Sequence, residues 1–299
     1  VWVENLIPRF RPTSRHASIM LPEVAGVIAQ SYGISLDRPS FQRTVEAINM
    51  PVVRAYDRST CAGALNAILG RPMFRHGRVG RSKASVRAHI DRLKAVLQID
   101  ATKLKVVQIA GSKGKGSTCC FLEHILRRGF KAKTGLFTSP HLVSLTERFR
   151  INGQPVNDDL LLRHFWWCWD KLVEEGITFS CSDFPSFFTF FTLVAVKIFI
   201  EQEVDIAILE VGIGGRLDST TGVIDQLVAC GISVLDYDHT SRLGSTLTQI
   251  AREKAGVMWT NIPAFVIRQR DEVRSFGRID VCARFFSKRI HSILVDVRE

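Results

Sequence analysis

The stretch that decides the fold is Val106-Val107-Gln108-Ile109-Ala110-Gly111-Ser112-Lys113-Gly114-Lys115-Gly116-Ser117-Thr118. It starts as an apolar, β-branched run and passes through a turn rich in glycine and lysine. It then continues into a helical pattern with apolar positions at Phe121, Leu122, Ile125 and Leu126. Glycines let backbone N–H groups converge on phosphate oxygens, and a helix N-terminus adds partial positive charge. This order of elements predicts a phosphate-binding loop.

The loop departs from the strict Walker pattern, because its glycine spacing is shorter and Gly116 separates Lys115 from Ser117. Taken alone, it fits an ordinary basic turn as well as a nucleotide site. The apolar strand before it and the amphipathic helix after it favour the nucleotide site. We expect Lys115 to reach the β- and γ-phosphates and the Ser117 hydroxyl to assist phosphate or metal binding.

Outward from this loop, short β-branched runs alternate with longer helical stretches. The run at residues 206–209 is apolar on both faces, as a central parallel strand requires. The alternation predicts an α/β fold with a mostly parallel central sheet flanked by helices, and ligands in such sheets bind at the carboxyl ends of the strands. We expect strands at 106–110, 132–137, 206–211, 227–233 and 264–267, and helices at 54–69, 85–97, 116–128 and 247–255, after Asn157 and after Pro185.

The 299 residues are 46% hydrophobic and 23% charged, which is enough apolar sequence for one large domain or two modest ones. Residues 1–50 lack sustained periodicity. We interpret them as an N-terminal extension, either a mitochondrial transit peptide or a disordered basic tail. We predict an ATP-binding domain over residues 51–290 and a short tail over 291–299.

Charge and cysteine usage narrow the class of partner. The net charge of +11 would suit nucleic acid or a small anion, but the basic residues are dispersed and match no nucleic-acid fingerprint. We therefore expect a small anionic ligand. Seven cysteines show no metal-binding spacing, and an odd number without a clear secretory signal favours a reducing compartment. The most apolar run, at 186–200, contains Lys197 and is too short to span a bilayer, so we predict a buried helix.

Five ordered blocks over residues 105–268 resemble the folylpolyglutamate synthase branch of the Mur ligase family. They are 111–117 (GSKGKGS), 134–142 (TGLFTSPHL), 147–153 (ERFRING), 210–218 (EVGIGGRLD) and 238–256, which contains DH, LGSTL and IAREKAG. The resemblance implies a P-loop NTPase-like sheet of the Mur ligase central-domain type. It also implies an ATP- and Mg²⁺-dependent enzyme of one-carbon metabolism, a tetrahydrofolate:L-glutamate γ-ligase (ADP-forming).

The resemblance also implies roles for individual residues. ATP would phosphorylate a folate carboxylate, and the amine of L-glutamate would attack the acyl phosphate. The ATP-binding residues would be Gly111, Ser112, Lys113, Gly114, Lys115, Gly116 and Ser117, and the Mg²⁺ ligands Ser139, Glu210 and His239. Lys115 and Lys254 would be catalytic, with Lys254 carbamylated into a carboxylate-like metal ligand; burial favours the neutral amine that reacts with CO₂.

Without the resemblance, each of these residues has an ordinary explanation. Glu210 is then either a surface acid at a strand end or a metal ligand, since an unpaired buried carboxylate is costly. Ser139 is then a turn-forming residue before Pro140, and Lys254 is a solvated residue of a helix. His239 is the weakest ligand candidate, because Mg²⁺ prefers oxygen donors. The aromatic residues near 165–169 and 187–191 have helical spacing, which favours core packing over a pterin site.

The chain departs from the family at Asp236, where glycine is usual. The resemblance implies a second, glutamate-binding α/β domain, which we expect to be missing from this chain. We therefore expect impaired ligase activity in this chain. The alternatives are dihydrofolate synthase and a non-catalytic nucleotide-binding domain. We expect a monomer that binds folate, L-glutamate and ATP, does not bind nucleic acid, is not integral to a membrane, and resides in the cytoplasm, the mitochondrion or both.

Overall fold

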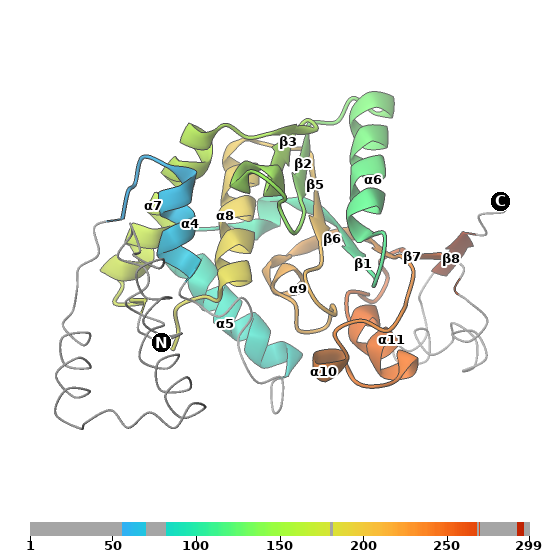
Figure 1. Ribbon diagram of the computed structural model, residues 1–299. Coiled ribbons are helices and arrows are strands. Elements are labelled where there is room, and N and C mark those ends of the chain that lie inside the picture. Colours follow the sequence, from blue (N-terminus) through green and yellow to red (C-terminus); the bar gives the residue numbers. More distant parts are fainter. Residues whose placement is uncertain (1–55, 70–81, 180–181, 268, 270–291, 296–299) are drawn as a thin grey trace, which may run out of the picture. The chain divides into compact units, whose positions relative to one another are not determined.

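The computed structural model describes residues 56–69, 82–179, 182–267, 269 and 292–295 (Figure 1). All of them fall within one structural unit, Tyr56–Glu299. The predicted extension over residues 1–50 lies outside the described residues, and so does most of the predicted tail. The proposed domain boundaries therefore stay predictions.

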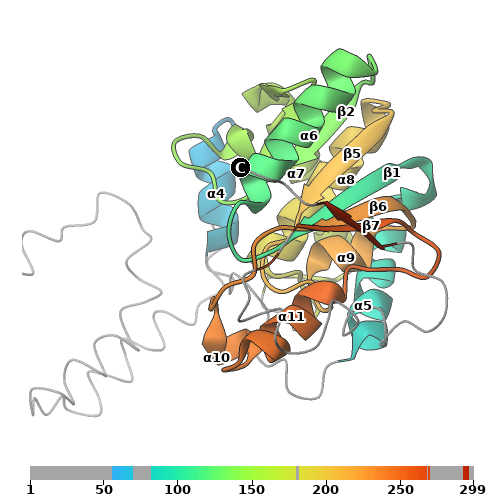
Figure 2. The ribbon, with the colours of Figure 1, turned by 90° about the vertical axis from the view of Figure 1, so that its right-hand side faces the viewer.

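One sheet organises the described part of the chain (Figure 2). Its eight strands lie in the order β4-β3-β2-β5-β1-β6-β7-β8, and Figure 2 shows the central strands β2, β5, β1, β6 and β7. The strands are β1 (Lys105–Ala110), β2 (Thr134–Phe137), β3 (Phe149–Ile151), β4 (Gln154–Pro155), β5 (Ile206–Glu210), β6 (Gln226–Ile232), β7 (Ala264–Ile267) and β8 (Ser292–Val295). The six from β2 to β8 in this order are parallel, and only the edge strands β3 and β4 pair antiparallel. The predicted α/β fold with a mostly parallel sheet is confirmed.

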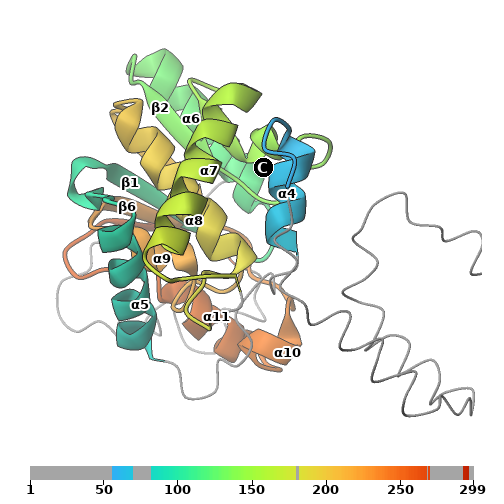
Figure 3. The same cartoon turned by 90° about the vertical axis from the view of Figure 1, so that its left-hand side faces the viewer.

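Helices cover both faces of this sheet. They are α4 (Cys61–Leu69), α5 (Lys83–Val96), α6 (Lys115–Gly129), α7 (Asp158–Glu174), α8 (Phe187–Glu201), α9 (Ser219–Val223), α10 (Thr240–Leu243) and α11 (Leu247–Ala255), with single 3₁₀ turns η1 (Ala101–Lys103) and η2 (Leu145–Arg148). Helix α6 lies on one face (Figure 2), whereas α5, α7 and α8 lie on the other (Figure 3).

The central strands are apolar on both faces because each face meets helices. In β1, Val107 and Ile109 pack with Ile208 of β5 and with Cys119 of α6. The alternate residue Val106 joins the larger core on the opposite face. Because successive side chains of a strand point to opposite faces, this one short strand contributes apolar side chains to the cores on both faces of the sheet.

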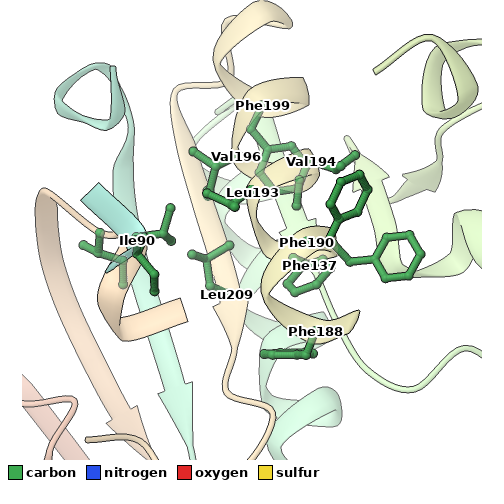
Figure 4. Close-up of a cluster of buried hydrophobic side chains, with 14 of the residues drawn as sticks. Ile90, Phe137, Phe188, Phe190, Leu193, Val194, Val196, Phe199 and Leu209 are labelled. Atoms are coloured by element: carbon green, nitrogen blue, oxygen red, sulfur yellow. The ribbon is translucent and has the colours of Figure 1, made fainter. Parts of the chain in front are cut away.

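Helix α8 forms the centre of the larger core (Figure 4). Phe188, Phe190, Leu193, Val196 and Phe199 are nearly inaccessible to solvent. The helix begins after Ser186, whose side chain accepts a hydrogen bond from the N–H of Thr189. The predicted buried helix is confirmed, and no helix in the described ranges has the length and apolarity to cross a bilayer.

The predicted aromatic packing is also confirmed. The Phe165 ring of α7 lies 4.9 Å from the Phe190 ring of α8, edge to face, and 6.1 Å from the Trp169 ring, stacked. Such pairs add to the free energy gained by burial alone. These rings belong to the interface between α7 and α8.

Several predicted boundaries were wrong at their N-terminal ends, among them that of α5, which begins at Lys83 rather than 85. Residues 56–60 are not helical, and α4 begins at Cys61. The Asp57 carboxylate accepts hydrogen bonds from Ser59 and Thr60, which forms a turn ahead of the helix. Strand β2 begins at Thr134 rather than 132.

Candidate active site

The predicted site residues follow the carboxyl ends of four neighbouring parallel strands. Ser139 follows β2, Glu210 ends β5, the loop at 111–117 follows β1, and His239 lies in the segment after β6. These strands are adjacent in the order β2-β5-β1-β6. The structure therefore brings the predicted residues to one edge of the sheet, where ligands of α/β proteins bind.

Two glycines shape the phosphate loop. Gly111 has φ of +148°, and a Cβ at this position would lie 1.9 Å from the Ser233 hydroxyl oxygen. Gly114 has φ of +78° and immediately precedes α6. It brings no side chain to cap the helix, so the first-turn N–H groups are left for an anionic ligand.

The loop is held against the segment that follows β6. The N–H of Ser112 donates to the carbonyl of Val234 at 2.8 Å, and the Ser233 hydroxyl donates to the carbonyl of Lys113 at 2.7 Å. These contacts fix the loop's backbone before any ligand arrives.

Two lysines donate to carbonyl groups of the loop. Lys115 Nζ lies 3.4 Å from the Ser112 oxygen, and Lys254 Nζ lies 2.5 Å from the Gly111 oxygen. Lys254 is almost fully buried, with 1% of its surface exposed. Lys254 is therefore not a solvated helix residue. Its side chain holds α11 against the phosphate loop.

Glu210 lies beside the loop. It is 4% exposed, and its Oε2 accepts a 2.9 Å hydrogen bond from the N–H of Ser139. Burial raises the pKa of this carboxyl, while the Ser139 N–H and the charges of Lys115 and Arg148 oppose the rise. A Cβ on Gly116 would lie 3.5 Å from Oε2, so Glu210 and the loop are in direct proximity.

The donors around Glu210 fit a hard cation. Its Oε1 accepts no hydrogen bond from a described residue, and the backbone contact brings Ser139, a second residue with a side-chain oxygen, next to it. In the part of the chain that the structure describes, no three His, Cys, Asp or Glu side chains gather into a metal site. An ion here would take its remaining ligands from water or phosphate, as Mg²⁺ does at nucleotide sites.

His239 lies in the segment that follows β6, and Glu210 ends β5; β1 is the strand between them. The Nε2 atom of His239 is 3.3 Å from Asp238 Oδ1. Burial lowers the pKa of the ring, the charges of Lys254 and Lys115 lower it further, and Asp238 opposes them. The structure thus joins Ser139 to Glu210 directly, and it brings His239 near Lys115 and Lys254.

The unusual Asp236 pairs with the loop. Its carboxylate lies 2.7 Å from Lys113 Nζ, and its carbonyl accepts a 2.8 Å hydrogen bond from the Ser112 hydroxyl. The extra acid is therefore an ion-pair partner of Lys113.

Two polar residues at this edge were missed from the sequence. Gln108, fully buried in β1, donates through Nε2 to the hydroxyls of Thr220 and Thr221, both at 2.8 Å. The Thr220 hydroxyl in turn donates to Asp218, whose other oxygen accepts the N–H of Ile213. This network orders the glycine-rich turn after Glu210. The sequence did contain a signal for Gln108, because a polar amide within an apolar strand must find hydrogen-bond partners when it is buried.

The second is Arg148, only 5% exposed at the end of η2. Its Nε donates to His141 Nδ1 at 2.8 Å. In the sequence it is one of two arginines in a polar block, and nothing there distinguishes it from a solvated residue.

Known proteins match this region closely in sequence. Folylpolyglutamate synthase of Arabidopsis thaliana is 50% identical over 184 residues, which are 61% of this chain and 31% of that protein. The mitochondrial folylpolyglutamate synthase of Bos taurus is 47% identical over 173 residues, 58% of this chain and 29% of that protein. The matched part of the chain is similar in sequence to folylpolyglutamate synthases. No family model matches it.

The fold of this chain is also similar to that of a solved folylpolyglutamate synthase (FPGS). This FPGS complex with AMPPCP and folate superposes with a TM-score of 0.64 at 25% identity, covering 78% of this chain and 54% of that one. The chain thus spans about half of the solved synthase, and its matches span less than a third of the curated ones.

Proposed function

We propose that this chain is the ATP- and folate-binding part of a ligase that joins L-glutamate to the γ-carboxylate of (tetrahydro)folate. The observation that carries the proposal is the position of the Glu210 carboxylate, which lies between Gly116 of the phosphate loop and the N–H of Ser139. The relatives' shared name and the FPGS complex with AMPPCP and folate support the same reading.

In this proposal the loop holds the nucleotide. The first-turn amides of α6 and the loop residues Gly111 to Ser117 surround the phosphates, and Lys115 neutralises charge on the transferring group. Glu210, Ser139 and His239 would hold Mg²⁺, with Lys254 as a carbamylated fourth contributor. When bound, the ion supplies charge neutralisation at the β- and γ-phosphates.

An amine does not displace oxygen from a free carboxylate, because that oxygen is a poor leaving group, so the carboxylate must first be phosphorylated. A folate carboxylate oxygen attacks the γ-phosphorus, the bond to the β-phosphate oxygen breaks, and ADP leaves. The amine of glutamate then attacks the acyl carbon, phosphate departs with the bonding pair, and the amine proton passes to solvent or phosphate. Positioning and charge stabilisation supply most of the acceleration in such transfers. The buried Lys254 and Gln108 contacts keep the loop and the turn after Glu210 in place.

We further propose a location for the protein, cytoplasmic, mitochondrial or both, and carbamylation of Lys254. The bovine relative is a mitochondrial protein, which supports a mitochondrial location beside a cytoplasmic one. Carbamylation of Lys254 predicts a mass increment of one CO₂ on its peptide in gently handled protein. An unmodified lysine under saturating bicarbonate would remove this part of the proposal.

Lys115→Ala tests the assignment. We expect MgAMPPCP affinity, measured by calorimetry, to fall about tenfold, and any glutamate-dependent ADP release to fall about 100-fold or more. Lys103→Ala is the matched control, since Lys103 is an exposed lysine at the opposite end of β1. Equal nucleotide binding by wild type and Lys115→Ala would reject the loop assignment. Binding without ADP release would instead favour the non-catalytic domain.

A further inference from the structure

Arg148 keeps a permanent charge in the interior. Only 5% of the residue is exposed, and among the described residues it forms no ion pair. Its Nε donates to His141 Nδ1, and its guanidinium carbon lies 5.7 Å from the centre of the Phe187 ring. A guanidinium carries five N–H donors and stays charged at physiological pH. Four of the five, those on the two terminal nitrogens, donate to no described group.

The backbone fixes where this side chain starts. Phe149 pairs with Phe137 of β2, and the N–H of Thr138 donates to the Arg148 carbonyl at 3.1 Å. Arg148 is therefore held across from the segment that carries Ser139. Because arginine only donates, His141 Nδ1 must accept this hydrogen bond. The pair leaves the outer fork of the guanidinium for another partner.

An oxyanion is the kind of partner that fits the outer fork of this guanidinium. Burying a charge without hydrogen-bonded compensation is costly, and a planar guanidinium fork matches a carboxylate or phosphate in geometry. Glu210 lies within electrostatic range, since each group shifts the pKa of the other, yet the two form no ion pair. Glu210 therefore does not serve as the direct ion-pair partner of Arg148.

The sheet order separates the two possible sources of that oxyanion. The phosphate loop follows β1, on one side of Glu210 at the end of β5. Arg148 precedes β3, which lies beyond β2 on the other side. The phosphates held by the loop are thus on the far side of Glu210 from Arg148, and the group that receives the phosphoryl unit belongs on the near side.

We infer that Arg148 binds the carboxylate of the acceptor substrate and holds it across Glu210 from the nucleotide, a role that rests on the ligase function proposed above. The fork would orient one carboxylate oxygen for attack while His141 and Phe187 prevent the guanidinium from turning away. Arg148 is in this sense a specificity residue for an acidic acceptor.

Calorimetric binding of three probes to the full chain tests the inference. The probes are folate, folate dimethyl ester, which has the same pterin but no free carboxylate, and MgAMPPCP. The variants are Arg148→Gln, Arg148→Lys and, as a matched control, Arg150→Gln. Arg150 lies two residues away, is partly exposed, and donates to the Glu147 carbonyl. Melting curves check that each variant folds.

We expect Arg148→Gln to weaken folate about 10- to 100-fold and to leave the ester and MgAMPPCP within about twofold, because a charge-assisted pair is lost. Arg148→Lys, which keeps the charge without the fork, should lose less. An equal loss for folate and its ester means that Arg148 only supports the loop, and a loss confined to MgAMPPCP makes its partner a phosphate; either overturns the inference. Wild type that binds no probe rejects the ligase function too, whereas unchanged folate binding by Arg148→Gln rejects the inference alone.

Discussion

The buried side chain of Lys254 donates a 2.5 Å hydrogen bond through Nζ to the carbonyl oxygen of Gly111, 143 residues earlier in the chain. The contact joins the last turn of α11 to the first residue of the phosphate loop. Because the side chain is 1% exposed, water does not compete for this bond. The geometry of the loop therefore depends on a helix that follows it late in the sequence.

Lys254→Met keeps most of the side-chain volume and removes the donor. We expect a loss of about 1–3 kcal/mol in unfolding free energy, since the Gly111 carbonyl loses its buried partner, and about tenfold weaker MgAMPPCP binding. Lys94→Met is the control: Lys94 is equally well enclosed at 6% exposure, but it pairs with Asp225. It should lower the melting temperature and leave nucleotide affinity unchanged. Equal effects of both variants on affinity would contradict the assigned role of Lys254.

Gly111→Ala should disrupt the loop, because the new Cβ would lie 1.9 Å from the Ser233 hydroxyl oxygen at a positive φ. Overpacking and backbone strain together suggest a cost of about 2–4 kcal/mol in denaturant unfolding. Gly129→Ala at the end of α6 is the counterpart, since nothing lies within 4 Å of its Cβ. That change should stabilise the protein by about 0.5–1 kcal/mol through helix propensity. A Gly111→Ala protein as stable as wild type would show that the loop is not packed as described.

Glu210→Gln should stabilise the metal-free protein at pH 7–8. Burial raises the pKa of Glu210, so between the ordinary value of 4.5 and the folded value the native state binds more protons than the unfolded state. Wild-type stability therefore falls as pH rises through that window, and the glutamine variant escapes this loss. Melting temperatures with chelator present should show the gain at pH 7–8 and none below pH 4.5. A pH-independent difference would mean that the carboxyl is not the cause.

Glu147 holds residues 142–144, the segment that follows Ser139, through hydrogen bonds to their backbone. Its carboxylate accepts the N–H groups of Leu142, Val143 and Ser144, which lower its pKa to about 2. A depressed carboxyl pKa stabilises the fold above the ordinary value of 4.5 and loses that effect as pH falls toward 2. After correction for intrinsic rates, these three amides should lose hydrogen-exchange protection over that range.

Glu147→Gln provides the complementary measurement at pH 7. It should speed exchange of the same three amides several-fold, on the order of the loss of one charged acceptor. Glu203→Gln, at an exposed turn after α8, should not alter them. Unchanged protection in Glu147→Gln would show that the backbone alone orders this segment.

The sequence predicted the elements whose signals are local. Helix α11 and strand β7 have the predicted ends, because capping by Thr246 and the turn residues before Ala264 are encoded within a few positions. The antiparallel hairpin of β3 and β4 was missed, since its strands of three and two residues carry no measurable periodicity. Pairing with β2 creates it, and that pairing is not a local property.

The same distinction applies to the site. The nearness of Glu210 to the phosphate loop follows from a general rule about strand ends, and the family resemblance singled out Glu210 and Ser139 among many acids and serines. The contact between them uses the Ser139 backbone N–H, which no side-chain motif reveals. Arg148 could not be found, because its significance lies in burial without an anionic partner, and burial is a property of the folded chain.

The strand order β2-β5-β1-β6 has a consequence for the time course of folding. Neighbours at this edge come from distant parts of the sequence, so the loop and α6 can form early while the groups around them are still apart. Each parallel pairing must close a long stretch of chain, and such closures are slow. Tight nucleotide capture during refolding should therefore lag behind helix formation and mark the moment when the central sheet is complete.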